Sequence, residues 1–285
     1  MNMFFTVIVV AYNAGDRLSA TLESILSQQN ADFRVIVKDA CSSDGSFENA
    51  RAYFDDPRIE WISSADKGIY DGMNQALTAS IGNRGSENTR GLIPGSEYVL
   101  FLNCGDLFHD KNVLENVSAL IERSISEGNG AKIYYGEIIE TLTGQRLGVA
   151  PYMDAFACFR NVPNHQAILY DAALLSEEHF DIRWRVRADY EHFLRCVLKR
   201  GEKTSSMDIV ICDYEGGGFS ESPEGRKISA REHKEITRIY FTGSQRFRYR
   251  AYMILTLQPL RHLLATHPLT TGAYNRIRRS LLKKR

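Results

Sequence analysis

The 285-residue sequence lacks the features that mark several specialised classes of protein. Its 7 prolines and 21 glycines recur at no fixed period, which excludes a collagen-like chain, and no internal repeat is present. The 5 cysteines are an odd number without a C-x-x-C pair, which indicates a reduced, cytosolic chain without a disulfide framework or zinc site. Because no basic N-terminal segment precedes a long apolar run, we expect no signal peptide.

Long apolar runs and glycine-rich phosphate loops are also missing. The longest uncharged apolar stretch of the C-terminal part, residues 251–260, is half of the roughly 20 residues that a membrane span needs. Pro259 interrupts it, so we expect a chain that does not cross a bilayer. Neither G-x-G-x-x-G nor G-x-x-x-x-G-K-[ST] occurs, so a bound phosphate group must be neutralised by a metal or by Lys and Arg.

Net charge is absent as well, but the two signs are distributed unevenly. The totals are 35 Lys and Arg and 35 Asp and Glu. Residues 1–225 carry 20 basic and 33 acidic side chains, whereas residues 226–285 carry 15 and 2. The length suits one main domain with an appendage, so we predict a domain at residues 1–225 and a basic extension at residues 226–285.

Apolar, β-branched runs alternate with segments of helical periodicity. Residues 4–11 are typical of a strand buried on both faces, and Leu18, Leu22 and Ile25 follow at helical spacing. The pattern predicts further strands at residues 33–37, 58–62, 98–102, 132–140 and 206–214, and helices at residues 47–54, 69–79, 113–126 and 188–199. Residues 80–97 are expected to form a long polar loop, and the stretch around Pro151 and Pro163 to be irregular. This alternation predicts an α/β fold with a mostly parallel sheet.

Polar residues follow three of the predicted strands, at residues 11–13, at Asp39 with residues 42–45, and at residues 103–106. In an open parallel sheet, ligands bind beyond these carboxyl ends. Turn chemistry accounts for each set taken singly. Their recurrence at successive strand ends favours a ligand site, in which Asp106 is a candidate ligand for Mg²⁺ or Mn²⁺ bridging a diphosphate.

Several segments together resemble glycosyltransferase family 2. They are residues 6–13, 39–45, 66–74, 98–106 and 187–191, in that order. The resemblance covers residues 4–220 and is greatest to bacterial enzymes that extend polysaccharide repeat units on a lipid carrier. It implies the GT-A fold, which is Rossmann-like, and an inverting, hexosyltransferase-type transfer of a sugar from a nucleotide donor. The nucleotide-sugar half would be residues 1–110 and the acceptor half residues 111–225.

The resemblance also implies roles for individual residues. Asp189 falls where the family places its general base, although a first-turn helix acid is the structural alternative. Asp106 matches the metal-binding aspartate of the D-x-D-like signature. Because Asn103 and Gly105 replace the other aspartates, weak binding of the Mg²⁺ or Mn²⁺ cofactor is expected. The donor-binding residues would be Ala11, Tyr12, Asn13, Asp39, Asp66, Lys67, Asn74, Asn103 and Gly105, and the acceptor or diphosphate residues His165, Gln166, Arg187, Gly217 and Ser220.

The basic extension interleaves Lys and Arg with aromatic and aliphatic residues. This composition suits an amphipathic helical segment in the interface of an anionic membrane. Binding of nucleic acid and packing against the acidic body are the alternatives. With a glycosyltransferase-like body, the membrane is preferred, and no nucleic-acid partner is expected.

The leading hypothesis is a cytoplasmic transferase on the inner face of the cytoplasmic membrane. It would move a sugar from a nucleotide donor, with UDP as the preferred nucleotide, to a lipid-linked saccharide in the biosynthesis of O-antigen, capsule or exopolysaccharide. An inverting transfer needs a carboxylate to deprotonate the acceptor hydroxyl and a positive centre for the departing diphosphate. The alternatives are a nucleotidyltransferase and a non-catalytic module that binds nucleotides or nucleic acid.

Overall fold

The computed structural model describes residues 3–82 and 97–256. The chain divides into two compact units, Met1–Ile236 and Thr237–Arg285. Most of the predicted polar loop at residues 80–97 lies outside the described residues, as do residues 257–285 of the predicted extension. The predicted domain limit at residue 225 falls within one helix, α8 (Pro223–Tyr240), and stays a prediction.

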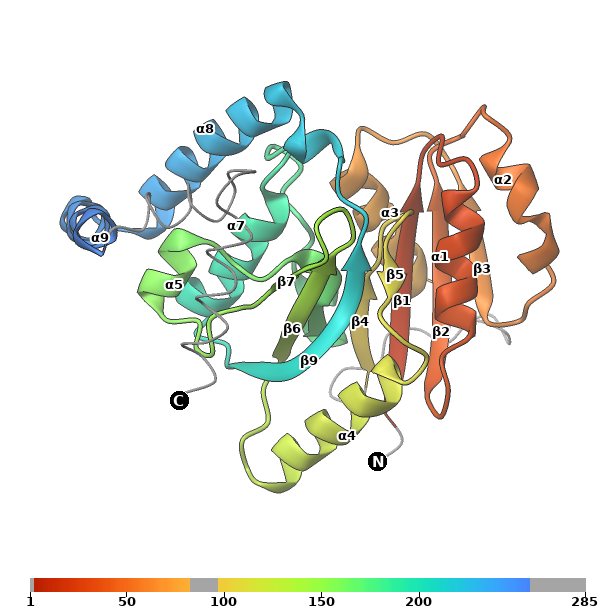
Figure 1. Ribbon diagram of the computed structural model, residues 1–285, viewed down its shortest axis with the longest axis horizontal. Helices are drawn as coiled ribbons and strands as arrows, with labels where there is room; N and C mark the ends of the chain where they lie inside the picture. Colours follow the sequence, from red (N-terminus) through yellow and green to blue (C-terminus); the bar gives the residue numbers. More distant parts are fainter. Residues whose placement is uncertain (1–2, 83–96, 257–285) are drawn as a thin grey trace. The chain divides into compact units, whose positions relative to one another are not determined.

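The first half of the main unit is a parallel α/β layer. Its elements are β1 (Phe4–Ala11), α1 (Arg17–Leu26), β2 (Asp32–Asp39), α2 (Ser46–Asn49) with a 3-10 turn (Ala50–Tyr53), β3 (Ile59–Ser63), α3 (Ile69–Gly82) and β4 (Glu97–Phe101). Strand β1 pairs in parallel with β2 and β4, and β2 pairs in parallel with β3. Helix α1 lies in front of these strands and α3 behind them (Figure 1). The predicted helices and strands of this half are present.

The second half extends the same sheet with mixed pairing. Its elements are β5 (Leu107–Phe108), α4 (Val113–Ser126), β6 (Ile133–Glu140), β7 (Gln145–Leu147), α5 (Ala155–Arg160), a 3-10 turn (His165–Ala167), β8 (Ile168–Asp171), α6 (Ala172–Glu177), α7 (Ala188–Leu194), a π-helical segment (Arg195–Lys199), β9 (Thr204–Tyr214) and a 3-10 turn (Phe219–Glu221). Within the described residues the strand order is β3-β2-β1-β4-β8-β6-β9-β5, with β7 beside β6. Strand β8 joins the halves through antiparallel pairs with β4 and β6.

The stretch around Pro151 and Pro163 is more regular than the sequence predicts. It contains β7, α5, β8 and α6, each of at most six residues. Segments this short span too few residues to display a period of 2 or 3.6. The central strand β8 is therefore not predicted from the sequence, although it joins β4 to β6 in the sheet.

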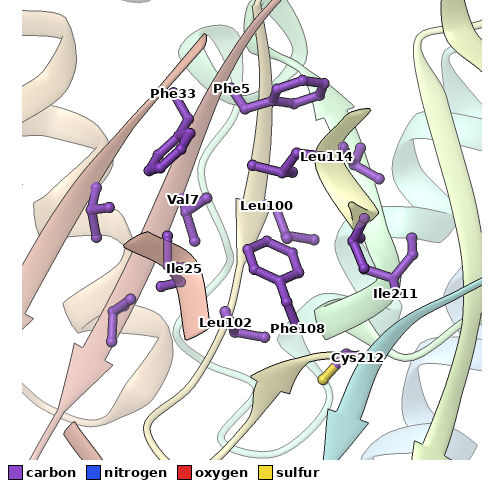
Figure 2. Close-up of a cluster of buried hydrophobic side chains, with 14 of the residues drawn as sticks. Phe5, Val7, Ile25, Phe33, Leu100, Leu102, Phe108, Leu114, Ile211 and Cys212 are labelled. Carbon is purple, nitrogen blue, oxygen red and sulfur yellow. The ribbon is translucent and has the colours of Figure 1, made fainter. Parts of the chain in front are cut away.

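One large core fixes the two halves together on the face covered by α1 and α4. Figure 2 shows Val7 of β1 and Leu100 of β4 beside Ile25 of α1, with Ile211 of β9 farther along the sheet. All four side chains are at most 1% exposed. Fully burying an aliphatic side chain stabilises a fold by about 1.5–3 kcal/mol. The carboxyl ends of β1, β4 and β9 are thus held in place relative to one another.

The second unit begins in the last turn of α8 and continues in α9 (Gly243–Leu255). Thr242 starts α9 with a capping box, in which its Oγ1 accepts the Gln245 N–H and the Gln245 side chain accepts the Thr242 N–H. The first helical turn therefore begins with satisfied N–H groups. None of the helices in residues 3–82 and 97–256 is long and apolar enough to cross a membrane.

Candidate active site

The first compact unit contains a cavity of about 970 Å³ beyond the carboxyl ends of β1 and β4, where α/β sheets bind ligands. A second cavity of about 550 Å³ adjoins it, since Tyr12 and Asn103 line both. Most of the predicted site residues lie on these walls. The larger cavity is lined by Tyr12, Lys67, Asn103, Asp106, His165, Gln166, Arg187, Asp189, Gly217 and Ser220, and the smaller one by Ala11, Tyr12, Asp66 and Asn103.

Asp189 lies in the first turn of α7 and faces a set of polar partners. Its Oδ1 accepts the Tyr70 hydroxyl at 2.9 Å and the Tyr190 N–H at 2.8 Å. Its Oδ2 lies 3.5 Å from Nδ1 of His165. The carboxylate is 19% exposed, so it is oriented by three neighbours yet open to the cavity. This is not the solvated first-turn acid of the structural alternative.

The pKa of Asp189 is lowered from its ordinary value of 3.8. Burial acts first and raises this pKa, but the His165 bond and charge, the Arg187 charge and the Tyr70 hydroxyl together outweigh it. The carboxylate is therefore ionised at neutral pH and able to accept a proton. Tyr70 has a pKa raised well above 10 by burial and by the Asp189 charge, so it stays a hydrogen-bond donor.

His165 connects Asp189 to the polar segment that follows β4. Its Nε2 lies 2.7 Å from Nδ2 of Asn103. Because the amide nitrogen donates, Nε2 accepts in this contact, and Nδ1 on the other side of the ring is directed toward Asp189. The Oδ1 atom of Asn103 is buried and has no hydrogen-bond partner among residues 3–82 and 97–256, and Asn103 itself lines both cavities.

Asp106 lies at the floor of the larger cavity and is 3% exposed. Its Oδ2 accepts the Gln166 side-chain N–H at 2.9 Å, and its Oδ1 accepts the Glu215 N–H at 3.0 Å. Burial raises the pKa of Asp106, and these two hydrogen bonds offset part of that effect. The cavity thus contains one buried carboxyl group, Asp106, and a nearby cation would stabilise its ionised form.

The donor set around Asp106 fits a cation that is shared with a substrate. Within residues 3–82 and 97–256, no group of three His, Cys, Asp or Glu side chains could hold a metal ion. Mg²⁺ is commonly bound by one or two carboxylates together with phosphate oxygens and water. One carboxylate at the cavity floor suits that mode and does not suit a metal held by protein ligands alone.

Asp39, Asn13 and Gly105 are predicted donor-site residues that line neither cavity. Asp39 is 1% exposed, and its carboxylate accepts the Ser42 hydroxyl at 2.5 Å and the Ser42 N–H at 3.0 Å. Ser42 Oγ in turn accepts the Asn13 N–H at 2.8 Å. Gly105 has a φ of +99°, and a Cβ there would collide with the Glu215 carboxylate. These residues shape the turns behind the cavity walls.

Asp66 lines the smaller cavity, and Asn74 holds α3 in place. Asp66 accepts the Lys38 ammonium at 3.0 Å, and the same ammonium donates to the backbone oxygen of Ser64 at 2.6 Å. The Lys38 side chain is fully buried. Asn74 lines neither cavity, because its amide binds both the O and the N–H of Phe180, at 2.8 and 2.9 Å. It joins α3 to the segment that precedes α7.

The outer wall of the larger cavity combines cationic and aromatic groups. The Arg185 guanidinium lies 4.3 Å from the ring centre of Phe219, a cation–π contact. Trp184 also lines this wall, and its buried Nε1 atom has no hydrogen-bond partner within the described part of the chain. Arg187 donates to Asn161 Oδ1 and to Ser229 Oγ, each at 2.8 Å. A ligand entering here meets two guanidinium groups and an apolar platform.

Some cavity residues carry no role in the sequence prediction. They include Arg17, Tyr70, Cys104 and Glu215. Tyr70 lies inside the 66–74 segment of the family resemblance, so that segment held a signal for it. Burial raises the pKa of the Cys104 thiol to about 12, so this cysteine is not a thiolate nucleophile. Arg17 and Glu215 form an ion pair at 3.5 Å in the cavity. Because these two residues lie far apart in the sequence, no local pattern predicts their contact.

A family model described as "Glycosyl transferase family 2" matches residues 6–183, which is more than half of the chain. Among curated proteins, the chain is 28% identical over 222 residues to the PGL/p-HBAD biosynthesis glycosyltransferase of Mycobacterium bovis, covering 76% of this chain and 79% of that protein. It is 27% identical over 206 residues to the amylovoran biosynthesis glycosyltransferase AmsB of Erwinia amylovora, covering 67% and 63%.

Solved structures of low sequence identity share the fold. S. aureus TarS 1-349 in complex with UDP-GlcNAc has a TM-score of 0.62 at 17% identity and covers 88% of this chain and 72% of that one. The mannosyltransferase PcManGT of Pyrobaculum calidifontis, in complex with GDP-Man and Mn²⁺, has a TM-score of 0.59 at 16% identity and covers 97% and 79%.

Proposed function

Because this chain belongs to glycosyl transferase family 2, we propose that it transfers a sugar from a nucleotide-sugar donor to a lipid-linked saccharide, with inversion at the anomeric carbon. The predicted family, enzyme class and GT-A fold are confirmed by the family match and by the shared fold of solved glycosyltransferases. Membership favours a sugar transferase over the nucleotidyltransferase and non-catalytic alternatives. A role in glycolipid or polysaccharide biosynthesis is supported by the names of both curated relatives.

One observation carries the proposed chemistry: the ionised Asp189 carboxylate faces the same cavity as Asn103 and Asp106. In a direct displacement, a base removes the acceptor's proton while the nucleoside diphosphate departs from the opposite side of the sugar. In the proposed reaction Asp189 takes that proton, with Tyr70 and His165 holding its two oxygens in place. A positioned general base contributes typically 10²- to 10⁴-fold to a rate.

The donor would lie across the two adjoining cavities. Tyr12, Asn103 and Arg17 line both of them and are placed to contact its nucleotide and diphosphate. Asp106 would hold a divalent cation together with the diphosphate oxygens, and that cation would offset the charge of the leaving group. A UDP-sugar is the preferred donor, supported by the UDP-GlcNAc complex of the TarS structure.

The acceptor would enter past the outer wall formed by Trp184, Arg185 and Phe219. Guanidinium groups suit a phosphate, and the aromatic and apolar surfaces suit a sugar ring or the start of a lipid chain. A lipid-borne acceptor also explains a basic, aromatic extension at residues 226–285. We place the enzyme at the inner face of the cytoplasmic membrane, attached through that extension.

The test combines donor binding with turnover of Asp189→Asn. Thermal shifts of the full chain with UDP, dTDP, GDP and CMP sugars, with and without Mn²⁺, identify the donor class and the metal requirement. With that donor and a lipid-linked saccharide, Asp189→Asn should lower kcat about 100-fold or more while the donor still raises Tm as in the wild type. NMR of the product should show the inverted anomer.

Asp55→Asn is the matched control, because Asp55 is exposed and lies in the turn that precedes β3. It should leave kcat and Tm unchanged. Full turnover by Asp189→Asn would remove Asp189 as the base, and a product that retains the donor's anomeric configuration would contradict the displacement. A wild-type chain that transfers no sugar from any of the four donor classes would contradict the proposed function itself.

A further inference from the structure

A buried carboxylate on α8 holds the segment that leads into the candidate base. Glu232 is 3% exposed. Its Oε1 accepts the Arg185 N–H at 2.9 Å, and its Oε2 accepts the Val186 N–H at 3.0 Å and the Arg187 N–H at 2.9 Å. Three successive backbone N–H groups that converge on one anion form a nest, an arrangement that binds negative charge.

Residues 185–187, which Glu232 holds, are linked to Asp189 through Tyr70. The Tyr70 hydroxyl lies 3.0 Å from the Val186 oxygen and 2.9 Å from Oδ1 of Asp189, so its one proton is shared between these two acceptors. Arg187 is the residue before α7, and its side chain binds Ser229 of α8. Helix α8 therefore holds the backbone of residues 185–187 through Glu232 and the side chain of Arg187 through Ser229. These residues directly precede α7, which carries Asp189.

We propose that Glu232 is a positioning residue for sugar transfer, which acts through residues 185–187 to set the place of the Asp189 carboxylate. It lines neither cavity, so it does not contact substrate. The proposal rests on the function proposed above, because it takes Asp189 as the base. It also gives α8 a part in catalysis, whereas the charge pattern alone assigns every residue after 225 to membrane attachment.

The three N–H groups need an acceptor at both carboxylate oxygens. A glutamine keeps the size of the side chain but supplies only one acceptor, and its NH₂ group would face an N–H donor of the nest. One or two of the backbone N–H groups would then lose their partner and the segment would shift. Displacement of a catalytic group by about 1 Å is enough to lower a rate by about 100-fold.

Glu232→Gln should therefore lower kcat by about 10- to 100-fold while the KM for the donor stays within about twofold of the wild type. Hydrogen exchange followed by mass spectrometry should show faster exchange of the amides of residues 185–187. Glu235→Gln is the matched control, since Glu235 lies on the same helix and is exposed. It should change neither kcat nor exchange.

A lower Tm for Glu232→Gln with unchanged kcat would overturn the proposal, because a merely structural residue would produce that result. Rapid exchange of the 185–187 amides in the wild-type chain would overturn it too, and this measurement needs no variant if Glu232→Gln fails to fold. Absence of transfer by the wild type would instead defeat the proposed function. An active wild type with an equally active, folded Glu232→Gln would defeat the positioning role alone.

Discussion

At the scale of single residues, Asp189 is governed by opposed influences on its pKa. Burial favours the neutral acid, while His165, Arg187 and Tyr70 favour the carboxylate and prevail. A carboxyl group whose pKa is lower in the folded chain binds its proton less tightly there than in the unfolded chain. It therefore stabilises the fold above the unfolded pKa of about 3.9, and this contribution is lost as the pH falls through the lower folded pKa.

This balance predicts how the pH dependence of turnover responds to substitution. In the wild type, protonation of Asp189 should not lower kcat/KM above about pH 5, because its pKa is below the ordinary value. His165→Gln removes the largest opposing influence and leaves the burial, so the pKa of Asp189 should rise and the acid limb of kcat/KM should move to higher pH. Tyr70→Phe should move it in the same direction by less. Profiles measured between pH 4 and 8 that superimpose for His165→Gln and wild type would contradict this account.

Residues that line the cavities were easier to predict from sequence than residues that support them. Tyr12, Asn103 and Asp106 follow strands at the carboxyl edge of the sheet, so their position along the chain is itself a signal. Lys38 and Glu232 carry no such signal. Lys38 lies inside a strand, Glu232 lies inside a charged helix, and each matters only through a contact with a distant segment.

At the scale of elements, the floor of the site depends on how β6 and β9 pair. The register shifts around Gly136, between Tyr135 and Glu137 and again between Glu137 and Ile138, which marks a β-bulge or a similar irregularity of the pairing. A Cβ at Gly136 would lie 2.8 Å from the backbone oxygen of Ile209 and 2.8 Å from Cδ1 of Ile211. Strand β9 ends one residue before Glu215, whose N–H binds Asp106.

Gly136→Ala should therefore lower the free energy of unfolding by about 1–3 kcal/mol, the range for overpacking of a filled interior. The backbone oxygen of Ile209 belongs to β9, so it cannot move aside without moving that strand. Gly243→Ala is the control, because the nearest atom to its added Cβ is the end of the Arg246 side chain at 4.0 Å. It should change the free energy by no more than about 0.5 kcal/mol. Urea unfolding of both variants measures the difference, and an equal effect would contradict crowding at the bulge.

The elements themselves were predictable where the pattern is long. Residues 4–11 and 113–126 coincide with β1 and α4 because eight or more residues display a clear period. Strand β8 has four residues, all buried, and its place between β4 and β6 follows from pairing across the sheet. The mixed second half of the sheet is thus a property of tertiary contacts.

At the scale of the whole molecule, the neutral total charge separates into an acidic body and a basic extension. Residues 237–256 of the second unit contain Arg238, Arg246, Arg248 and Arg250 and no acidic residue. Large apolar side chains of α9 are exposed among these arginines, including Phe247 at 78% and Leu255 at 79%. Basic and apolar groups together suit the interface of an anionic bilayer.

The extension should therefore bind anionic vesicles through α9. Replacing Arg246, Arg248 and Arg250 with Gln should weaken cosedimentation of the full chain with phosphatidylglycerol vesicles roughly 100-fold, because each basic residue near such a surface contributes about 1 kcal/mol. The donor should still raise Tm as in the wild type, since these residues lie outside both cavities. Point variants are preferable to truncation at residue 225, which would also remove Glu232.

Phe247→Ser tests the apolar part of the same surface, and Tyr152→Ser is its control, because Tyr152 is 81% exposed but belongs to the acidic body. Only Phe247→Ser should weaken vesicle binding, and both should keep the donor-induced rise in Tm. Added salt should weaken the wild-type interaction, since screening reduces the attraction of Arg for the headgroups. Undiminished vesicle binding by the triple Arg variant would show that the charge division of this chain serves something other than membrane attachment.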